Sequence, residues 1–130
     1  MKAIQITAFG GPEVMTYTDL PDPVAGSDEV LLDVTAIGIN YADTHQTENS
    51  YLSPQTLPMV PGIEVVGTNA GKRYLASVSS GGYAQRAIAH KSVLFPIPDS
   101  VSDQQALCML VQGSTAWHLL KTMGNISAGQ

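Results

Sequence analysis

Alternation of hydrophobic and polar positions predicts strands through most of the chain. Residues 29–40 are apolar on both faces of such a strand: Val30, Leu32, Val34 and Ala36 on one face, Leu31, Ile37 and Ile39 on the other. We therefore expect this strand to be covered on both sides. Further strands are predicted at Lys2–Ala8, Val14–Thr18, Ile63–Gly67, Arg73–Val78 and Tyr83–Ala89, separated by Gly- and Pro-containing turns. Many short strands without regular intervening helices indicate a barrel or a sandwich.

Helical spacing replaces this alternation after Pro98. Ser102 and Gln105 have the spacing of a capping box, so a helix is predicted to begin there. Its apolar stripe consists of Ala106, Leu107, Leu110 and Val111. A second helix is predicted after Gly113-Ser114, with Ala116, Leu119, Leu120 and Met123 on one face and Gly124 at its C-terminal cap. The pattern predicts one domain over residues 1–124 and the start of a linker at 125–130.

Composition and charge narrow the class of protein. Hydrophobic residues make up 44% of the chain and charged residues 13%, which predicts a globular rather than a disordered chain. The net charge is −5, and the six Lys and Arg residues are scattered, so we do not expect a nucleic-acid partner.

Cys108, as the single cysteine, excludes an internal disulfide and a Cys-rich zinc site, which fits a reducing cytoplasm. No signal-peptide pattern and no apolar run long enough for a membrane span is found. We therefore expect a cytoplasmic protein without a membrane partner.

Five segments resemble the medium-chain dehydrogenase/reductase superfamily. The residues Ala36–Asp43 and Leu57–Gly67 resemble the superfamily as a whole. In chain order, Phe9–Val14, Gly81–Ala84 and Leu110–Trp117 resemble its quinone oxidoreductase branch. The resemblance implies a mainly β fold over 1–124: a GroES-like, partly open β-barrel with short helices and a C-terminal helical pair.

The residues at the zinc-ligand positions of this superfamily cannot bind zinc. Asn40 stands where zinc alcohol dehydrogenases carry a cysteine, and Ile63 stands where they carry a histidine. The position of their third ligand falls near Val111 or Gln112. The three histidines of the chain have no ligand spacing either. We therefore expect no metal site.

Without zinc to polarise a carbonyl, the resemblance implies an electrophilic acceptor, a quinone or an enone, reduced with NADPH. The alternative is a stand-alone GroES-like binding or assembly module without catalysis. The segments Asn40–Asp43 and Pro61–Glu64 favour the enzyme, and Thr44–Leu57 is too polar for the mobile apolar loop of a co-chaperonin.

By the same resemblance, Asn40, Asp43 and Tyr51 are the candidate catalytic residues, with Asn40 and Asp43 on the floor of the cleft and His45 and Tyr51 on its wall. Each has a structural alternative. Asn40 can satisfy neighbouring backbone groups at a strand end, Asp43 can be favoured by a helix dipole, and an exposed loop tyrosine needs no role. Glu64 is expected to order the local hydrogen bonds rather than to contact substrate.

The candidate cofactor-binding residues are Asn40, Gln112 and Thr115; the resemblance places Gln112 and Thr115 beside the nicotinamide. Thr115 can instead cap a helix. The chain contains no Gly-x-Gly-x-x-Gly turn for a dinucleotide phosphate, so we expect it to end before a nucleotide-binding domain and to be inactive alone. The apolar circumference of the last helix predicts a homo-oligomer.

Overall fold

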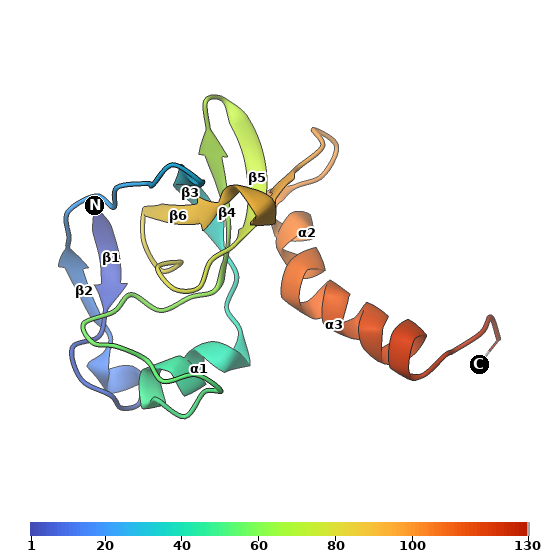
Figure 1. The fold of residues 1–130 in the computed structure, drawn as a ribbon, viewed down its shortest axis with the longest axis horizontal. Coiled ribbons are helices and arrows are strands. Elements are labelled where there is room, and N and C mark those ends of the chain that lie inside the picture. The colour runs from blue at the N-terminus through green and yellow to red at the C-terminus, as the bar shows by residue number, and fades with distance from the viewer. Residues whose placement is uncertain (130) are drawn as a thin grey trace.

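The computed structural model describes residues 1–129, and their main element is a curled antiparallel sheet (Figure 1). Its five strands lie in the order β6-β3-β4-β5-β7, with bounds β3 Glu29–Ile37, β4 Glu64–Asn69, β5 Lys72–Ser77, β6 Arg86–His90 and β7 Leu94–Pro96. A separate hairpin pairs β1, Lys2–Gln5, with β2, Thr16–Asp19. The sheet forms a half-barrel, so the predicted mainly β, partly open barrel is confirmed.

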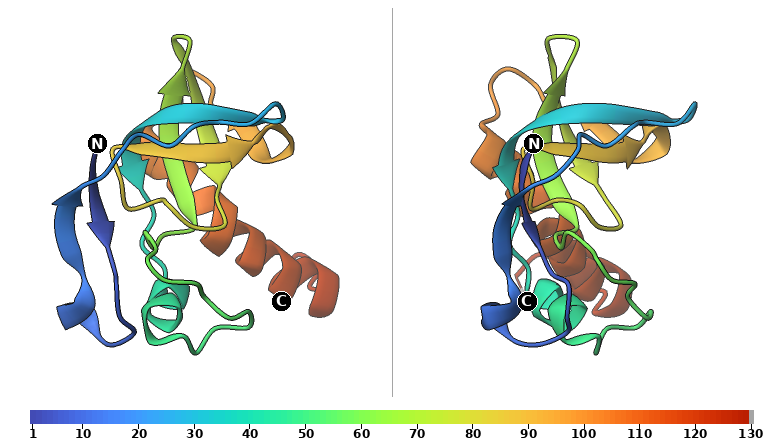
Figure 2. Two further views of the ribbon diagram at one scale, coloured as in Figure 1. Left: turned by 60° about the vertical axis from the view of Figure 1, so that its left-hand side comes forward. Right: turned by 90° about the vertical axis from the view of Figure 1, so that its left-hand side faces the viewer.

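The helices lie at two places around this sheet. Helix α1, Tyr41–Glu48, follows β3, and short 3-10 turns occupy Pro12–Val14 and Lys91–Val93. Helix α2, Asp103–Cys108, continues through π-helical turns and α3 in one rod: Met109–Gly113, then α3 at Ser114–Trp117, then His118–Met123. Figures 1 and 2 show this rod leaving the sheet and projecting away from the rest of the molecule. No helix among residues 1–129 is long and apolar enough to cross a membrane.

The predicted helical pair is present as α2 and α3, but no break separates the two helices. Gly113 has helical backbone angles, φ −65° and ψ −46°, and a π-helical turn carries the chain through it. A glycine weakens a helix by about 1 kcal/mol without stopping it, which explains the continuity. Gly124 caps the rod as predicted, and Asn125, with φ 47°, turns the chain away.

Buried clusters lie on both faces of the sheet, because the neighbouring residues Val65 and Val66 of β4 belong to different clusters. One buried cluster consists of Leu32, Val65, Ala76, Val78, Ala87 and Ala89. A second joins the sheet to the first turns of the rod through Val66, Leu75 and Ala106. The expectation that the Glu29–Asn40 strand is covered on both sides holds only in part. Ala36 packs on the second cluster and the Thr35 hydroxyl bonds to Asp103 of α2. Asp33 is exposed, and Ile37 and Ile39 are 37% and 80% exposed.

Two predicted strands begin two or three residues later than expected, because their first residues have other partners. In Val14–Thr18 the strand begins only at Thr16, since Pro12 starts a 3-10 turn that ends at Val14. In the range Tyr83–Ala89 the observed strand begins at Arg86, because the residues before Arg86 bond to β1 instead. The Tyr83 carbonyl accepts from the Ile4 N–H at 2.8 Å, and the Gln85 N–H donates to the Lys2 carbonyl at 2.9 Å. Alternation did not predict the short β7.

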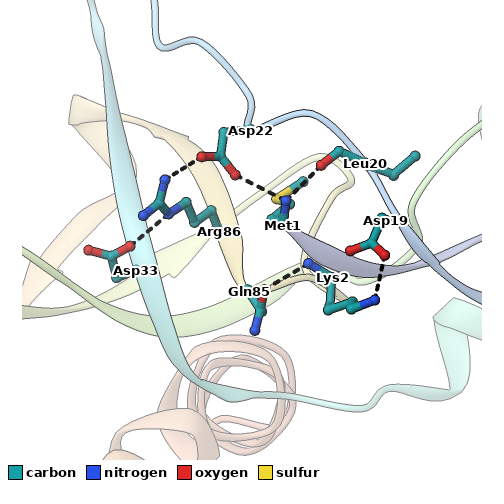
Figure 3. Close-up of polar contacts among 8 residues, drawn as sticks. All are labelled: Met1, Lys2, Asp19, Leu20, Asp22, Asp33, Gln85 and Arg86. Atoms are coloured by element: carbon teal, nitrogen blue, oxygen red, sulfur yellow. Dashed lines mark hydrogen bonds and ion pairs between the residues drawn. The ribbon is translucent and has the colours of Figure 1, made fainter.

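Polar contacts fasten the β1–β2 hairpin to the sheet (Figure 3). Arg86 bridges Asp22, which follows β2, and Asp33 of β3, with Nε 3.0 Å from Asp33 Oδ1. The backbone N–H of Lys2 donates to Gln85 Oε1 at 2.7 Å. These groups are exposed, so each ion pair contributes at most about 1 kcal/mol, and the hairpin depends mainly on its backbone bonds.

Candidate functional site

The candidate site begins where β3 ends and α1 starts. Asn40 is the N-cap residue of α1, in extended conformation, and its backbone N–H donates to Asp43 Oδ2 at 2.9 Å. The two residues are 7% and 2% exposed. A carboxylate in the first turn is favoured by the partial positive charge of the helix N-terminus. The local sequence therefore buries an amide and a carboxylate side by side.

Tyr83 approaches the same carboxylate from the segment before β6. Its hydroxyl donates to Asp43 Oδ2 at 2.6 Å. Burial, and then the hydrogen bond to Asp43 and its negative charge, raise the pKa of Tyr83 far above the ordinary value. The phenol therefore stays protonated and acts here as a donor. Among the described residues, the other oxygen, Asp43 Oδ1, is buried without a hydrogen-bond partner.

Glu64, the first residue of β4, is the second buried carboxylate and is 1% exposed. Its Oε1 accepts from Asn40 Nδ2 at 2.9 Å, and its Oε2 accepts from the backbone N–H of Val111 at 3.3 Å. Gly38 makes room for it, because a Cβ at that position would lie 2.2 Å from Glu64 Oε1. Both strand ends are thus shaped around this carboxylate.

The rod closes the network from the opposite side. Gln112 Nε2 donates to Asn40 Oδ1 at 2.7 Å. Asn40 therefore uses its N–H, its amide nitrogen and its amide oxygen on three different partners. This junction connects the sheet, α1 and the rod through a single side chain.

Another buried polar side chain, that of Gln46, supports the turn before β4. Gln46 of α1 is 2% exposed, accepts from Gly62 N at 3.2 Å and donates to Ser79 O at 3.4 Å. Gly62 has φ 97°, and a Cβ there would lie 2.5 Å from the Tyr83 ring. Glycine is required at this turn for both reasons.

The structure brings together three of the five predicted site residues, Asn40, Asp43 and Gln112. It does not connect the other two with them. Tyr51 is 39% exposed in the loop after α1, and Thr115 is exposed on the rod; neither side chain has a hydrogen-bond partner among residues 1–129.

His45, expected on the cleft wall with Tyr51, contacts residues close to it in the sequence instead. Its Nδ1 lies 2.8 Å from Ser50 Oγ, and its ring meets Tyr41 edge to face. Sequence reasoning missed Tyr83 and Gln46. Only the Gly81-Gly82 turn hinted that Tyr83 returns toward α1, and no local pattern pairs residues so far apart.

Two further observations concern metal ligands and a groove beside β3. No group of three His, Cys, Asp or Glu side chains within the described part of the chain could hold a metal ion. A mostly apolar groove of about 500 Å³ lies between the hairpin and the outer face of β3, with Tyr83, Ile4, Tyr17, Ile37 and Ile39 among its walls. The polar network itself offers positioned donors and acceptors rather than a nucleophile.

The known proteins that this chain resembles include several quinone oxidoreductases. The alcohol dehydrogenase GroES-like domain matches residues 26–73, which contain Asn40, Asp43 and Glu64. Human quinone oxidoreductase is 32% identical over 143 aligned residues, covering all of this chain and 44% of that protein. The chain thus spans less than half the length of this relative.

Solved structures extend the likeness to the fold. The quinone oxidoreductase of Thermus thermophilus, solved alone and with NADPH, is 40% identical with a TM-score of 0.86, covering 94% of this chain and 40% of that one. A probable oxidoreductase from Mycobacterium abscessus is 33% identical with a TM-score of 0.93, covering 100% and 45%.

Proposed function

Because the chain belongs to the medium-chain quinone oxidoreductases, whose N-terminal GroES-like part it covers, we propose that it is the substrate-side domain of an NADPH-dependent, zinc-independent reductase of quinones or activated alkenes. The main support is the coincidence of two findings. The likeness to the Thermus thermophilus enzyme runs along nearly the whole chain, and the buried polar network centres on Asn40, which the resemblance places where zinc alcohol dehydrogenases carry a cysteine ligand.

The proposed NADPH contacts involve Asn40, Gln112 and Thr115 at the nicotinamide end. The contacts of Asn40 fit this proposal, because its oxygen already accepts a hydrogen bond from the Gln112 amide at 2.7 Å and a carboxamide N–H could do the same. When bound, NADPH supplies a hydride. These 130 residues contain no Gly-x-Gly-x-x-Gly turn that could hold the pyrophosphate, so we propose that the chain alone binds NADPH weakly and is inactive.

The proposed roles of the remaining candidates follow from their exposure. Asp43 is buried behind Asn40 and Tyr83, so we assign it a positioning role rather than contact with the acceptor. Tyr51 lies in an exposed loop, where its ring can stack on a flat acceptor or its hydroxyl can donate a proton. A quinone needs little further activation, because its own conjugation spreads the arriving charge.

The second candidate is a binding or assembly module without catalysis. The exposed apolar rod supports it, because such a surface can serve a partner protein as well as a second domain. The two functions differ in one measurable property, the reduction of a quinone.

The test joins residues 1–124 to the nucleotide-binding part of the Thermus thermophilus enzyme and follows NADPH oxidation with 1,4-benzoquinone. We expect turnover, and we expect Asn40→Ala and Tyr51→Phe to lower kcat/KM by an amount equivalent to about 1–3 kcal/mol while the thermal midpoint changes little. Glu48→Gln, on the exposed end of α1, serves as the control. A folded chimera without turnover contradicts the reductase and favours the binding module.

Zinc independence needs its own measurement. Asn40 and Ile63 cannot serve as the cysteine and histidine ligands, so we expect metal analysis of the purified chain to find no stoichiometric zinc after dialysis against a chelator. A ratio near one zinc per chain contradicts this part of the proposal.

A further inference from the structure

Glu64 is a buried carboxylate that forms no ion pair with any positively charged group among residues 1–129. Five of the six Lys and Arg side chains bond elsewhere in the described chain: Lys2 to Asp19, Arg73 to Asp103, Arg86 to Asp22 and Asp33, Lys91 to Ser27 O and Lys121 to Ile126 O. The sixth, Lys72, is exposed at the tip of the β4–β5 hairpin. A buried charge without a counter-ion is unfavourable for stability. Its role must therefore be sought in the groups it contacts.

Both groups that Glu64 contacts are hydrogen-bond donors, and one of them, a backbone N–H, has a fixed orientation. Val111 presents a backbone N–H to Oε2, and Asn40 presents its side-chain NH2 to Oε1. An asparagine amide can turn either its oxygen or its nitrogen to a neighbour, whereas a carboxylate only accepts. Glu64 therefore holds the Asn40 nitrogen toward itself and directs Asn40 Oδ1 toward Gln112.

We propose that Glu64 is a positioning residue that fixes the orientation of the Asn40 amide, so that the site selects a ligand group that donates a hydrogen bond where Gln112 Nε2 now lies. The orientation follows from the contacts alone, whereas the selection rests on the proposed function. A nicotinamide carboxamide has such an N–H; a quinone has only acceptor oxygens. Asn40 Oδ1 therefore faces the cofactor rather than the quinone.

A charge-neutral exchange of the two side chains tests the orientation in the 130-residue chain. In Glu64→Gln, the Val111 N–H takes the amide oxygen, the new NH2 faces Asn40, and the Asn40 amide must turn over. In Asn40→Asp, two carboxylates meet at a contact that is 2.9 Å in the original chain. The double variant restores every bond, because Gln at position 64 donates to Asp at position 40, which still accepts from Gln112.

We expect Asn40→Asp to lower the thermal midpoint by roughly 10 °C or more, or to prevent folding, and the double variant to recover most of the loss. Nuclear Overhauser contacts should join the Asn40 NH2 protons to the Glu64 side chain in the original chain, and this contact should be lost in Glu64→Gln. Glu48→Gln is the matched control and should change neither result. A double variant as unstable as Asn40→Asp, or an Asn40 NH2 group that turns toward Gln112 in the original chain, overturns the proposal.

Two small probes test separately whether the site selects a ligand group that donates a hydrogen bond. At millimolar concentration, nicotinamide should shift the Asn40 and Gln112 side-chain amide signals, whereas methyl nicotinate, which has no N–H, should leave them unchanged. Equal shifts with both probes, or none with either, contradict the selection of a donor. Because this result is independent of the orientation test, a failure of the proposed cofactor role remains distinguishable from a failure of the positioning role.

Discussion

The sheet and the C-terminal rod carry similar apolar residues, but they bury very different shares of them. Leu32, Val65 and Val66 in the sheet are fully buried, whereas Leu119 and Met123 in the rod are 61% and 79% exposed. The sheet closes a core of its own. The rod packs on the sheet only through its first turns, around Ala106. Beyond them its apolar side chains lack a partner in the described part of this chain, so the helical periodicity there predicts the conformation of the rod but not its stability.

The two regions meet over the first turns of the rod. Asp103 accepts from the Thr35 hydroxyl and pairs with Arg73, and both contacts attach the rod to the sheet. The Thr35 hydrogen bond, followed by Arg73, holds the pKa of Asp103 below its usual range against a partial effect of burial. Gln112, at the far end of this junction, reaches Asn40. The polar site therefore lies at the end of the segment over which the rod contacts the sheet.

Truncation of the sheet core should have the largest effect. Leu32→Ala leaves a cavity among Val65, Ala76 and their neighbours, and we expect a loss of about 2–5 kcal/mol in the free energy of unfolding. Leu119→Ala, the matched change in the rod, should cost less than about 0.5 kcal/mol. Urea titration measures both. Equal losses would show that the rod is packed as tightly as the sheet.

A methyl group at Gly38 should disturb the site itself. Its Cβ would lie 2.2 Å from Glu64 Oε1, so Gly38→Ala must displace a buried carboxylate, and we expect a loss of up to about 3 kcal/mol. Gly26→Ala is the control, because its Cβ meets only the end of the Glu29 side chain, at 3.3 Å. Thermal unfolding of the two variants compares them. A Gly38→Ala variant as stable as the control would mean that Glu64 can move freely.

Much of this arrangement could be predicted from the chain because it is local. The alternation of apolar and polar residues predicted most of the strands, the Ser102–Gln105 spacing predicted the start of α2, and Gly124 predicted the end of the rod. These signals depend on neighbouring residues and on caps. The continuity of the rod through Gly113 could not be predicted, because one glycine signals a possible break without deciding it.

The site was predictable only where a resemblance named its residues. Hydrogen bonds bring Asn40, Asp43 and Gln112 together, although 72 positions separate Asn40 from Gln112. Their catalytic and cofactor-binding roles stay predictions. Tyr83 was missed, since nothing around it in the sequence indicates the return to Asp43. The end of this predicted strand is less covered than expected, because the apolar character of Ile37 and Ile39 does not indicate which residues pack against them.

The Tyr83–Asp43 bond should contribute less than the packing around Gly38. Tyr83→Phe removes one of two donors to a buried carboxylate oxygen, and we expect a loss of about 1.5 kcal/mol at neutral pH. Because the folded-state pKa of Tyr83 is raised above its ordinary value of 10.0, the unfolded chain loses the proton first. Stability should therefore decline as the pH rises above about 10, and more steeply in the original chain than in the variant.

Unfolding midpoints between pH 8 and about 11.5 measure that slope. Tyr41→Phe is the matched control, because Tyr41 is 80% exposed and its side-chain hydroxyl has no bond to Asp43. Identical alkaline slopes in the original chain and Tyr83→Phe would show that the phenol does not titrate differently in the folded state.

The smallest effect on monomer stability is expected for a substitution in the rod, which should instead alter the self-association of the chain. We propose that the exposed apolar side chains Trp117, Leu119, Leu120 and Met123 make the chain self-associate. Leu119→Lys should change the free energy of unfolding by less than about 0.5 kcal/mol at low concentration and reduce the association. Light scattering at several concentrations tests it. A strict monomer that binds no hydrophobic dye contradicts it.

The contrast between sheet and rod is tested most directly by amide hydrogen exchange of the original chain at its lowest usable concentration. We predict that amides of β3, β4 and β5 exchange only through global unfolding, that those of α2 exchange somewhat faster, and that those from Ser114 to Met123 exchange orders of magnitude faster than the sheet. Protection of the rod equal to that of β4 in a proven monomer would contradict the account.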